Sequence, residues 1–437
     1  MLVAPLLACT DGRDDVAGEP PASPAGWLDE AGRVRLTRGM NLAGDAKWQD
    51  DLRVELDDAT LELLPAHGVD LVRYLVFWQG IEPEAGQLDV AYMDGVAEDV
   101  ERLRALGVDV VIDLHQDVWG EGFGYTGFPR WACDEATYAA FTPAGEHWSL
   151  DYLDPAVVAC FDAFWASEDL QARYADAAAA LAERVAGRVV AYDTMNEPFW
   201  GSWEQEAFET GPLAAFDARV AEALRDVDPD AWIVVEPSGQ TNLLGTSHLV
   251  LPEVDRVVYA PHFYPSYAEM GTGYDGDFAD EAAWIDGLFR DDAPLWLGEF
   301  GIFSDVGNEG EWVRAVLAAV EARGGSTAYW SFDPGNVLEA DGTAGWLLPT
   351  WATPRPSAVP GNVVSLETAA DGFTLTYDAT VDAPLRVVLP PAGCATVHVV
   401  GEPALDGEGE LPATGGVELA GEPGVRQAVT ARCVETG

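Results

Sequence analysis

Short apolar runs recur along the first three quarters of the chain, and most are followed by a stretch with helical periodicity. The runs are continuously hydrophobic rather than alternating, which predicts strands covered on both faces, as in a parallel sheet. The stretches between them, such as 92–107 and 311–325, place apolar residues on one helical face and end at glycine, which tolerates a left-handed C-cap. We place the eight strands at 34–42, 71–76, 108–115, 189–197, 232–237, 257–264, 295–300 and 326–332.

Eight strand–helix units over about 320 residues predict a (β/α)8 TIM barrel of the α/β class. The main alternative is a doubly wound open sheet. Such a sheet would normally carry a glycine-rich phosphate loop after its first strand, and RGMNLAGDAKW at 38–48 lacks that spacing. We therefore predict the barrel, spanning 25–352.

The pattern of residues changes after the predicted barrel. Residues 353–362, TPRPSAVPGN, are rich in proline and predict a linker. Residues 363–437 show short alternating runs separated by turn residues, which predicts a small antiparallel β-sandwich as a C-terminal domain.

The N-terminal residues 1–24 predict a truncated signal and a tether. MLVAPLLAC ends like a bacterial lipoprotein signal at Cys9, although it lacks a basic region, and 10–24 are rich in Asp, Pro and Gly. The alternative is a frayed apolar terminus. We expect a secreted protein or a lipoprotein anchored through Cys9, outside the cell or in the periplasm. No later segment reaches the roughly 18 apolar residues of a membrane span.

The net charge limits the binding partners that the chain can have, and the cysteine content limits its metal and redox chemistry. The chain has 75 acidic and 23 basic residues, a net charge of −52, so nucleic acids and anionic membranes are poor partners. The remaining cysteines have no CxxC spacing, which disfavours zinc and thioredoxin chemistry. Two disulfides in an exported protein fit best, with four free thiols as the alternative. The candidates are one pair in mid-chain and one near the C-terminus: Cys133, Cys160, Cys394 and Cys433.

Two glutamates follow predicted strands at the end of the barrel where active sites lie. Glu197 stands in MNEP after the fourth strand, and Glu299 stands in GEFG on the seventh. A glycosidase needs one protonated carboxyl group to assist the leaving oxygen and one carboxylate to attack the anomeric carbon. We predict Glu197 as acid/base and Glu299 as nucleophile, with retention of configuration. Their carboxyl groups should then lie about 5 to 5.5 Å apart, against 6.5 to 9.5 Å for inversion.

Other polar and aromatic residues at the strand ends are predicted to bind the sugar or to tune these glutamates. Asn196 could bond a sugar 2-hydroxyl, and Arg73 and Tyr264 could keep Glu299 charged. Trp330 suits a sugar-stacking platform. Lys47 is the only lysine of the chain and falls near the mouth. The set at the strand ends is completed by Asn41, Asp113, His115, Asp117 and His262.

Simpler interpretations exist for several of these residues. His115 and His262 could be core histidines bonded to backbone, and Arg73 could only balance buried acids. A metal at Asp113, His115 and Asp117 is disfavoured, because these ligands crowd one strand end without a clear third imidazole. We expect neither a metal nor a cofactor.

The chain resembles glycoside hydrolase family 5, and within it the endoglycoceramidases. The family resemblance rests on Arg73, His115, Asn196, Glu197, His262, Tyr264, Glu299 and Trp330. The narrower one rests on NLAGDAK (41–47), DLHQDVWG (113–120), HWSLDYLDPAVVACFDAFW (147–165), YDTMNEPF (192–199) and APHFYP (260–265). It implies the same roles for the two glutamates. It also implies that Lys47, Asp113, Asp117 and Trp148 hold the sugar next to ceramide.

By this resemblance we expect a retaining enzyme that cuts the β-bond between the glycan and ceramide of glycosphingolipids. Neutral glycolipids fit the acidic chain better than sialylated ones. Loops after the fourth, seventh and eighth strands are candidates for the lipid side, and Trp346, Leu347 and Leu348 predict an exposed apolar patch. The insertion at 120–147 could be tied down by a Cys133–Cys160 bond and could reshape the glycan side.

Three alternatives stay open at this stage. Another family 5 β-glycosidase could act on glucosylceramide, a steryl glucoside or an aryl glucoside. An endo-β-glucanase is less favoured, because no extended row of aromatic platforms is evident, and a non-catalytic glycolipid-binding protein would not need both glutamates. We expect a monomer that touches a membrane or micelle surface only transiently.

Overall fold

The computed structural model describes residues 26–42, 45–54, 57–145, 148–269, 271, 273–303 and 307–434. The predicted signal and tether, with Cys9, lie outside the described residues. Within the described part of the chain, no helix is both long and apolar enough to cross a membrane.

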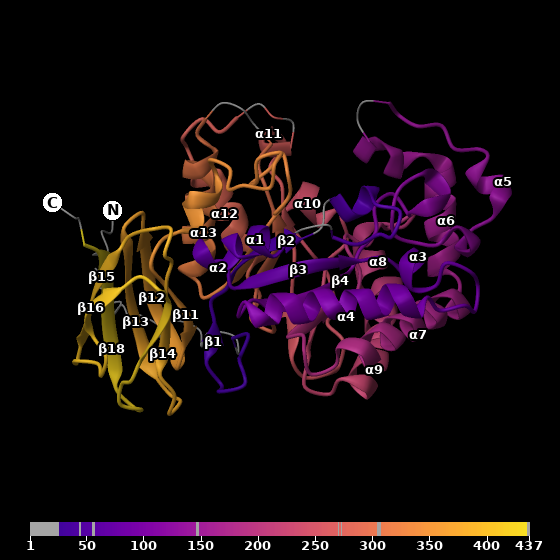
Figure 1. Cartoon of the computed structure of the whole chain (residues 1–437). Helices are drawn as coiled ribbons and strands as arrows, with labels where there is room; N and C mark the ends of the chain where they lie inside the picture. Colours follow the sequence, from indigo (N-terminus) through magenta and orange to yellow (C-terminus); the bar gives the residue numbers. More distant parts are fainter. Residues whose placement is uncertain are drawn as a thin grey trace, which may run out of the picture.

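A parallel sheet of nine strands forms the larger part of the molecule (Figure 1). Its order is β7-β6-β5-β4-β3-β2-β10-β9-β8, and β7 and β8 come from the one run predicted at 257–264. A bridge between Tyr259 of β7 and Leu295, which directly precedes β9, closes the sheet, and the predicted (β/α)8 barrel is confirmed. Pro261, which has no N–H to donate, lies where that run is interrupted. The strands are β2 (Arg38–Leu42), β3 (Leu71–Val76), β4 (Asp109–Leu114), β5 (Ala191–Asp193), β6 (Trp232–Val235), β7 (Val257–Tyr259), β8 (His262–Phe263), β9 (Trp296–Phe300) and β10 (Ser326–Tyr329).

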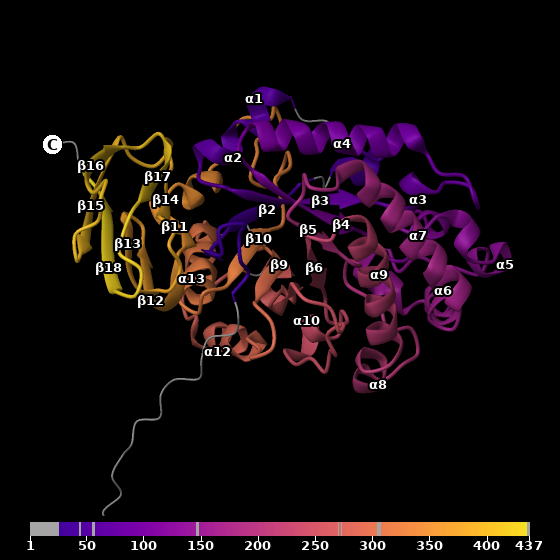
Figure 2. The same ribbon diagram turned by 90° about the horizontal axis from the view of Figure 1, so that it is seen from below.

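Helices cover the outside of the barrel, with α4, α7 and α9 packed side by side (Figures 1 and 2). Their starts are set by side-chain caps: Asp89 accepts the Tyr92 N–H, and Ser167 accepts the Leu170 N–H. The α-helices are α1 (Asp58–Leu61), α2 (Leu63–Ala66), α3 (Trp78–Ile81), α4 (Val90–Ala105), α5 (Glu135–Tyr138), α6 (Pro155–Trp165), α7 (Glu168–Val185), α8 (Gln205–Glu209), α9 (Pro212–Val227), α10 (Thr241–Leu244), α11 (Ser266–Glu269), α12 (Ala279–Leu288) and α13 (Glu309–Glu321). The 3-10 turns are η1 (Asp45–Trp48), η2 (Glu121–Phe123), η3 (Arg130–Ala132), η4 (Trp148–Leu153) and η5 (Leu348–Trp351).

The barrel interior is apolar in the layer farther from the carboxyl ends of the strands. Small and β-branched side chains such as Val111, Ala191 and Ala328 pack there around Trp27 and Trp296, whose ring centroids lie 5.6 Å apart. Trp27 precedes the first barrel strand. The polar side chains of the interior are consequently gathered above this layer, toward the carboxyl ends of the strands.

Two antiparallel sheets form the smaller domain, confirming the predicted sandwich (Figure 1). Between them lies a second apolar core that includes Phe373, Leu375 and Tyr377. One sheet has the order β1 (Val34–Arg35), β11 (Arg355–Val359), β14 (Leu385–Leu389) and β17 (Gly415–Leu419). The other has β12 (Gly361–Ala369), β13 (Gly372–Ala379), β18 (Arg426–Cys433), β15 (Thr396–Glu402) and β16 (Gly409–Pro412).

The predicted linker at 353–362 is wrong. Half of it forms β11, whose five residues are all buried, and β12 begins at Gly361. Proline is tolerated because the register of β11 against β14 shifts just after Pro356, where a regular ladder is interrupted. The strand predicted at 34–42 is also divided, since β1 pairs with β11 of the sandwich and only β2 belongs to the barrel.

The sandwich packs against the amino ends of the barrel strands. Arg355 is fully buried and donates to the carbonyl oxygens of Leu36 (2.6 Å) and Gly68 (2.9 Å). It also forms an ion pair of 2.7 Å with Asp70. The sandwich therefore lies at the end of the barrel opposite to the strand ends that carry the predicted site.

Candidate active site

Arg73 occupies the centre of the polar end of the barrel. It lies in the middle of β3 and is fully buried. Burial by itself would lower the pKa of Arg73, but the surrounding carboxylates outweigh it and raise that pKa well above its ordinary value. Arg73 balances buried acids and also contacts Glu299, so it does more than the simpler interpretation allowed. Its guanidinium contacts oxygens of Asn41 (3.0 Å), Asp113 (2.9 Å), Asp193 (3.0 Å), Asn196 (2.9 Å), Glu236 (2.8 Å) and Glu299 (2.7 Å).

Glu299, at the end of β9, is held at both carboxylate oxygens. Arg73 donates to Oε1 at 2.7 Å, and the Tyr264 hydroxyl donates to Oε2 at 2.9 Å. Burial raises the pKa of Glu299 above its ordinary value, and the charge of Glu197 adds to this, while His262 and Arg73 oppose it. The two donors fix the orientation of the carboxylate and favour its ionised form, as a nucleophile requires.

Glu197 follows β5 and is held through one oxygen. Asn242 of α10 donates to Oε1 at 2.7 Å, and Nδ1 of His262 lies 2.9 Å from the same atom. Among the described residues, no hydrogen bond ends on Oε2. The side chain keeps 23% of its surface exposed, against 7% for Glu299. Oε2 is thus the oxygen placed to carry a proton to and from a substrate.

His262 stands between three carboxyl groups. Its Nδ1 faces Glu197 and lies 3.7 Å from Glu299, and its Nε2 lies 3.2 Å from Glu236. Burial alone would lower the pKa of His262, but these carboxylates raise it well above the ordinary value. These side-chain contacts correct the interpretation of His262 as a core histidine bonded to backbone.

The two predicted catalytic carboxyl groups meet. One oxygen of each and a ring nitrogen of His262 all lie within 4.8 Å of one another. This is close to the separation of retaining glycosidases and well below the 6.5 to 9.5 Å of inverting ones. The same three atoms could face a metal ion, but Nδ1 of His262 and Oε1 of Glu197 lie 2.9 Å apart, as in a direct hydrogen bond.

A second group of charges surrounds His115, just past the end of β4. Its Nδ1 lies 2.7 Å from Asp113 and its Nε2 lies 3.4 Å from Asp117. The pKa of His115 is lowered by burial and by Lys47, but the two aspartates raise it above the ordinary value overall. Burial opposes ionisation of Asp117, yet Lys47 and His115 hold its pKa well below the usual range.

Lys47 and Trp330 complete this group. Nζ of Lys47 lies 2.5 Å from Asp117 and 4.2 Å from the centroid of the Trp330 ring. Trp330 also stacks on His115, with 5.7 Å between ring centroids and 15° between planes. The structure thus brings together the residues predicted to hold the sugar, apart from Trp148. A flat indole flanked by charged donors and acceptors suits a pyranose ring and its hydroxyls.

Trp148 belongs to a rim of the site rather than to its centre. It lies in η4, is 49% exposed, and neighbours Tyr125 and Tyr152 at ring-centroid distances of 6.3 and 6.5 Å. Gln116 links this rim to the acid/base, because its Nε2 bonds the Tyr152 hydroxyl and the carbonyl oxygens of Asn196 and Glu197.

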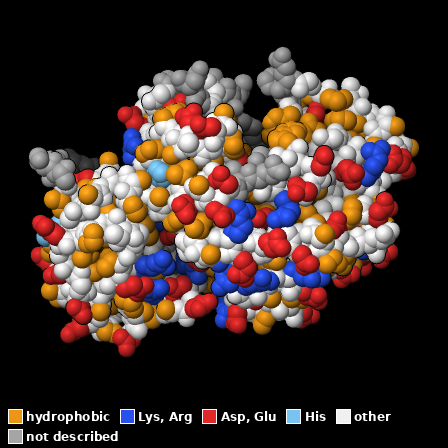
Figure 3. Space-filling view, viewed as in Figure 1, with side chains coloured by type: hydrophobic (Ala, Val, Ile, Leu, Met, Phe, Trp, Pro, Cys, Tyr) orange, Lys and Arg blue, Asp and Glu red, His pale blue; other side chains and the backbone are white. Residues whose placement is uncertain are grey.

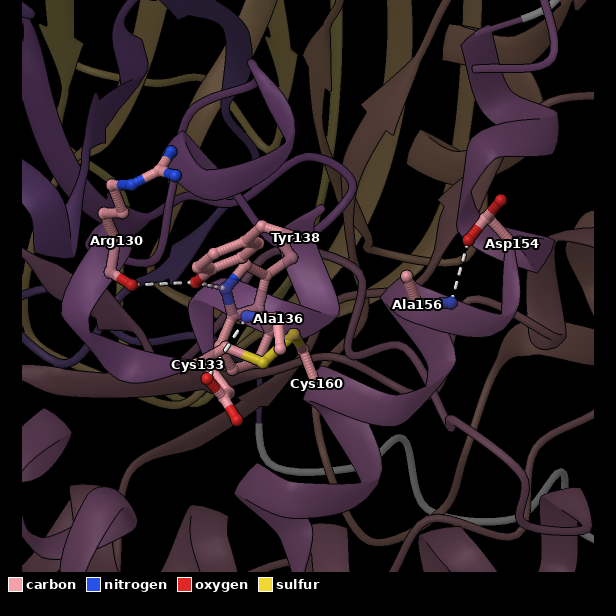
Figure 4. The surroundings of a disulfide bond; sticks show 9 residues. Arg130, Cys133, Ala136, Tyr138, Asp154, Ala156 and Cys160 are labelled. Atoms are coloured by element: carbon pink, nitrogen blue, oxygen red, sulfur yellow. Dashed lines mark hydrogen bonds between the residues drawn. A yellow bond between two sulfur atoms is a disulfide. The ribbon is translucent and has the colours of Figure 1, made fainter. Parts of the chain in front are cut away.

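A disulfide fastens the segment that carries this rim (Figure 4). Cys133 is joined to Cys160 of α6, confirming the expected bond, and Cys394 is joined to Cys433 in the sandwich. Next to the first bond, the Tyr138 hydroxyl donates to the Arg130 carbonyl oxygen (3.0 Å), as Figure 4 shows. The segment is thereby attached to the barrel wall.

The apolar patch predicted at 346–348 is wrong in two of its three members. Trp346 is 60% exposed, but Leu347 and Leu348 are buried in the barrel core. The reason is η5, which turns the chain back against α13 and places both leucines inside.

Sequence reasoning missed four residues that contact the catalytic pair or its supports. Glu236 ends WIVVEP after β6, so the signal that identified Glu197 could also have found it. Asp193 was hidden inside the YDTMNE run, and Gln116 inside DLHQD. Asn242 lies on a four-residue helix, and no feature of its sequence surroundings marks it.

Comparison with known proteins agrees with this site. Endoglycoceramidase I of Rhodococcus hoagii (strain 103S) is 28% identical over 338 residues, which cover 71% of this chain and 67% of that protein. A glucosylceramidase of Rhizopus delemar is 27% identical over 238 residues, covering 40% of this chain and 35% of its own.

Structures of endo-glycoceramidase II from Rhodococcus sp. are similar over 94% of this chain and 100% of theirs. The ganglioside GM3 complex is 30% identical with a TM-score of 0.81, and the lactosyl-enzyme intermediate is 31% identical with a TM-score of 0.80. The family model Cellulase (glycosyl hydrolase family 5) matches residues 28–336, well over half of the sequence. On this match, and with the carboxyl groups of Glu197 and Glu299 close together at the strand ends, the chain belongs to glycosyl hydrolase family 5.

Proposed function

We propose that this protein is a retaining endoglycoceramidase, which releases an intact glycan from ceramide. The observation that carries the proposal is the unequal environment of two neighbouring carboxyl groups. Glu299 is bonded at both oxygens by Arg73 and Tyr264, whereas the hydrogen bonds that Glu197 accepts from described residues all end on Oε1. The first is arranged to stay ionised, and the second to exchange a proton.

The reaction then proceeds in two displacements. Glu299 attacks the anomeric carbon, the bond to the ceramide oxygen breaks, and Oε2 of Glu197 gives its proton to that oxygen. A glycosyl ester of Glu299 remains. Glu197, now a carboxylate, removes a proton from water, which attacks the same carbon and frees both the sugar and Glu299. The two inversions give net retention.

The substrate class rests on the relatives and on the group around Trp330. The similar endo-glycoceramidase II of Rhodococcus sp. forms a lactosyl-enzyme intermediate, which supports a disaccharide as part of the substrate here. In this chain, Lys47 and Asp117 flank the indole and supply charged partners for sugar hydroxyls. The glucosylceramidase of Rhizopus delemar keeps a second candidate open, namely removal of a single glucose from ceramide.

Lactosylceramide and glucosylceramide, assayed side by side, separate these functions. We expect lactose from the first substrate, and loss of that activity in Glu197→Ala and in Glu299→Gly. A protein that releases only glucose, and leaves lactosylceramide intact, is a glucosylceramidase instead. Binding of glycolipid without any cleavage by the wild type would refute enzymatic function altogether.

Contact with an uncharged lipid surface is part of this proposal. Large apolar side chains are exposed on loops that follow several barrel strands: Trp48, Trp148, Leu150, Leu153, Phe303 and Trp346. Figure 3 shows hydrophobic side chains gathered over η4, beside a notch that separates this lobe from the one above α11. Phosphatidylcholine vesicles carrying lactosylceramide should bind the protein, and Leu150→Asp with Leu153→Asp should weaken that binding without slowing cleavage of a soluble lactoside.

We also propose that the chain works outside the cytoplasm, as a monomer. Its two disulfides belong in an oxidising compartment, and LLAC at Cys9 matches the end of a lipoprotein signal. Cys9→Ala should release the protein from the membrane fraction of a bacterial host. Retention of that variant would argue against the anchor.

A further inference from the structure

We propose that Glu236 is a positioning residue that sets the orientation of the acid/base Glu197; this inference rests on the proposed function. Glu236 directly follows β6 and is 2% exposed, so it cannot meet a substrate. Its Oε2 accepts the backbone N–H of Glu197 at 2.7 Å. Its Oε1 accepts from Nη2 of Arg73 at 2.8 Å and lies 3.2 Å from Nε2 of His262.

The backbone of Glu197 needs such a support. Its φ is +39°, in the left-handed region that residues with a Cβ rarely adopt. Strained conformations of this kind persist only when surrounding contacts over-determine them. A charge-assisted bond from the Glu197 N–H to a buried carboxylate is such a contact, and the carboxylate is itself fixed by Arg73.

A second path from Glu236 reaches the side chain of Glu197. His262 faces Glu236 with Nε2 and Oε1 of Glu197 with Nδ1. One carboxylate thereby orients both the backbone and, through the ring of His262, the Oε1 atom of the acid/base. With Oε1 engaged, Oε2 is the oxygen directed to the leaving group.

A glutamine at this position cannot replace the glutamate. Both oxygens of Glu236 accept, one from the Glu197 N–H and the other from the Arg73 and His262 side. An amide offers one acceptor and one donor, so either orientation turns an NH2 group toward a donor. Glu236→Gln therefore keeps the shape of the side chain but loses one of its two acceptor oxygens, and with it one of the two contacts that hold Glu197.

The test compares two soluble lactosides that differ in their leaving group. Dinitrophenolate leaves without a proton, whereas an alkyl alcohol requires one from Glu197. In Glu236→Gln, kcat/KM for octyl β-lactoside should fall about tenfold or more beyond any fall for dinitrophenyl β-lactoside, within the 10²–10⁴ contributed by general acid catalysis. The ratio of the two kcat/KM values does not depend on the amount of folded protein. The test therefore remains decisive even if the variant folds poorly.

Asp217→Asn is the matched control. Asp217 is also a fully buried carboxyl group, but it is bonded by Thr194 on the outer side of β5. Its ratio should equal that of the wild type. Glu236→Asp, too short to reach all its partners, should shift the ratio in the same direction as Glu236→Gln.

The outcomes separate the two proposals. Equal losses on both lactosides in Glu236→Gln, or an unchanged ratio in Glu236→Asp, overturn the positioning role and leave the endoglycoceramidase standing. A wild-type protein that cleaves neither lactosides nor lactosylceramide refutes the proposed function itself.

Discussion

At the residue scale, the mouth of the barrel holds six carboxyl groups beside two fixed cations and two histidines. Burial and the neighbouring Glu236 raise the pKa of Asp193 well above its ordinary value, although Arg73 opposes this. The pKa of Glu236 falls to about 2; burial opposes this, but His262 and Arg73 outweigh it. The carboxyl groups of Asp113, Asp117, Glu236 and Glu299 are each paired with a side chain from the set Lys47, Arg73, His115 and His262. This pairing allows so many polar groups to stay buried together.

Tyr264→Phe should move the acid limb of the pH–activity profile to higher pH. The Tyr264 hydroxyl donates to the ionised form of Glu299, and losing that bond raises the pKa of Glu299 further above its ordinary value. Because only ionised Glu299 attacks, activity is lost at a higher pH than in the wild type. The measurement is kcat/KM for dinitrophenyl β-lactoside against pH.

Tyr267→Phe is the control for this experiment, since the Tyr267 hydroxyl accepts from Trp312 away from the catalytic pair. A profile of Tyr264→Phe that overlays both the wild type and this control would show that the hydroxyl does not tune Glu299.

Asp217→Asn should stabilise the protein at neutral and alkaline pH. Burial raises the pKa of Asp217 to about 8, although Thr194 donates to it. The folded state therefore holds a proton that the unfolded chain releases near pH 4, and wild-type stability falls as pH rises from about 4 to about 8. The asparagine variant has no such loss.

The gain in melting temperature of Asp217→Asn should grow across that window and stay constant above it. A gain of the same size at pH 4 and pH 8, or none at all, would contradict a protonated Asp217.

At the scale of elements, the site is made by strand ends, and the rim by one long connection. β3, β4, β8 and β9 each contribute residues within or just after a strand, where the backbone is rigid. The connection between β4 and β5 instead carries Trp148 and Tyr152, and the Cys133–Cys160 bond fastens it to α6. We therefore expect chemistry to depend on the strands and sugar affinity to depend on the connection.

Replacing Cys133 and Cys160 by alanine should raise KM for lactosides more than it lowers kcat. The bond closes a loop of 27 residues, so its loss costs about 3 kcal/mol of unfolding free energy and loosens the rim first. Steady-state kinetics and thermal unfolding measure both effects.

The Cys394–Cys433 pair, which closes 39 residues in the sandwich, is the matched comparison. Removing it should lower stability to a similar extent and leave KM unchanged. Equal KM values in both double variants would show that the first bond has no role at the rim.

At the scale of the whole molecule, the sandwich is joined to the barrel by strand pairing and by buried contacts, not merely attached to it by the chain. β1 precedes the barrel in sequence but pairs with β11 beyond it, and Arg355 bonds backbone near the starts of β2 and β3. The two domains should therefore unfold together.

A chain cut to residues 26–352 should accordingly fail to unfold cooperatively at the temperature of the full protein. In the full chain, Arg355→Met leaves the Asp70 carboxylate without its ion-pair partner and should cost about 3 kcal/mol. Thermal unfolding followed by circular dichroism measures both. A truncated chain that unfolds as cooperatively as the intact one, and at the same temperature, would show that the two domains do not unfold together.

Much of this arrangement was predictable because it depends on local pattern. Continuous apolar runs predicted all eight barrel positions, and a charged residue directly after such a run identified Glu197 and, within a run, Glu299. The linker at 353–362 failed because proline content is a weak signal when a strand runs through an irregular register. The predicted exposure of Leu347 and Leu348 was wrong because a loop can fold back onto the core, and hydrophobicity alone does not say whether a loop residue faces the core or the solvent.

Local patterns predicted the barrel, the sandwich, the meeting of Glu197 with Glu299 and most of the residues around Trp330, because strand periodicity and strand-end polarity are properties of consecutive residues. The contacts between distant residues were needed to show that Oε1 of Glu197 is the bonded oxygen, that Glu236 bonds its backbone, and that β1 crosses to the sandwich. Those features depend on contacts between residues 39 to more than 300 positions apart, and on the direction of individual side chains. No local pattern records such distances, since the closure of the barrel alone brings the partners together.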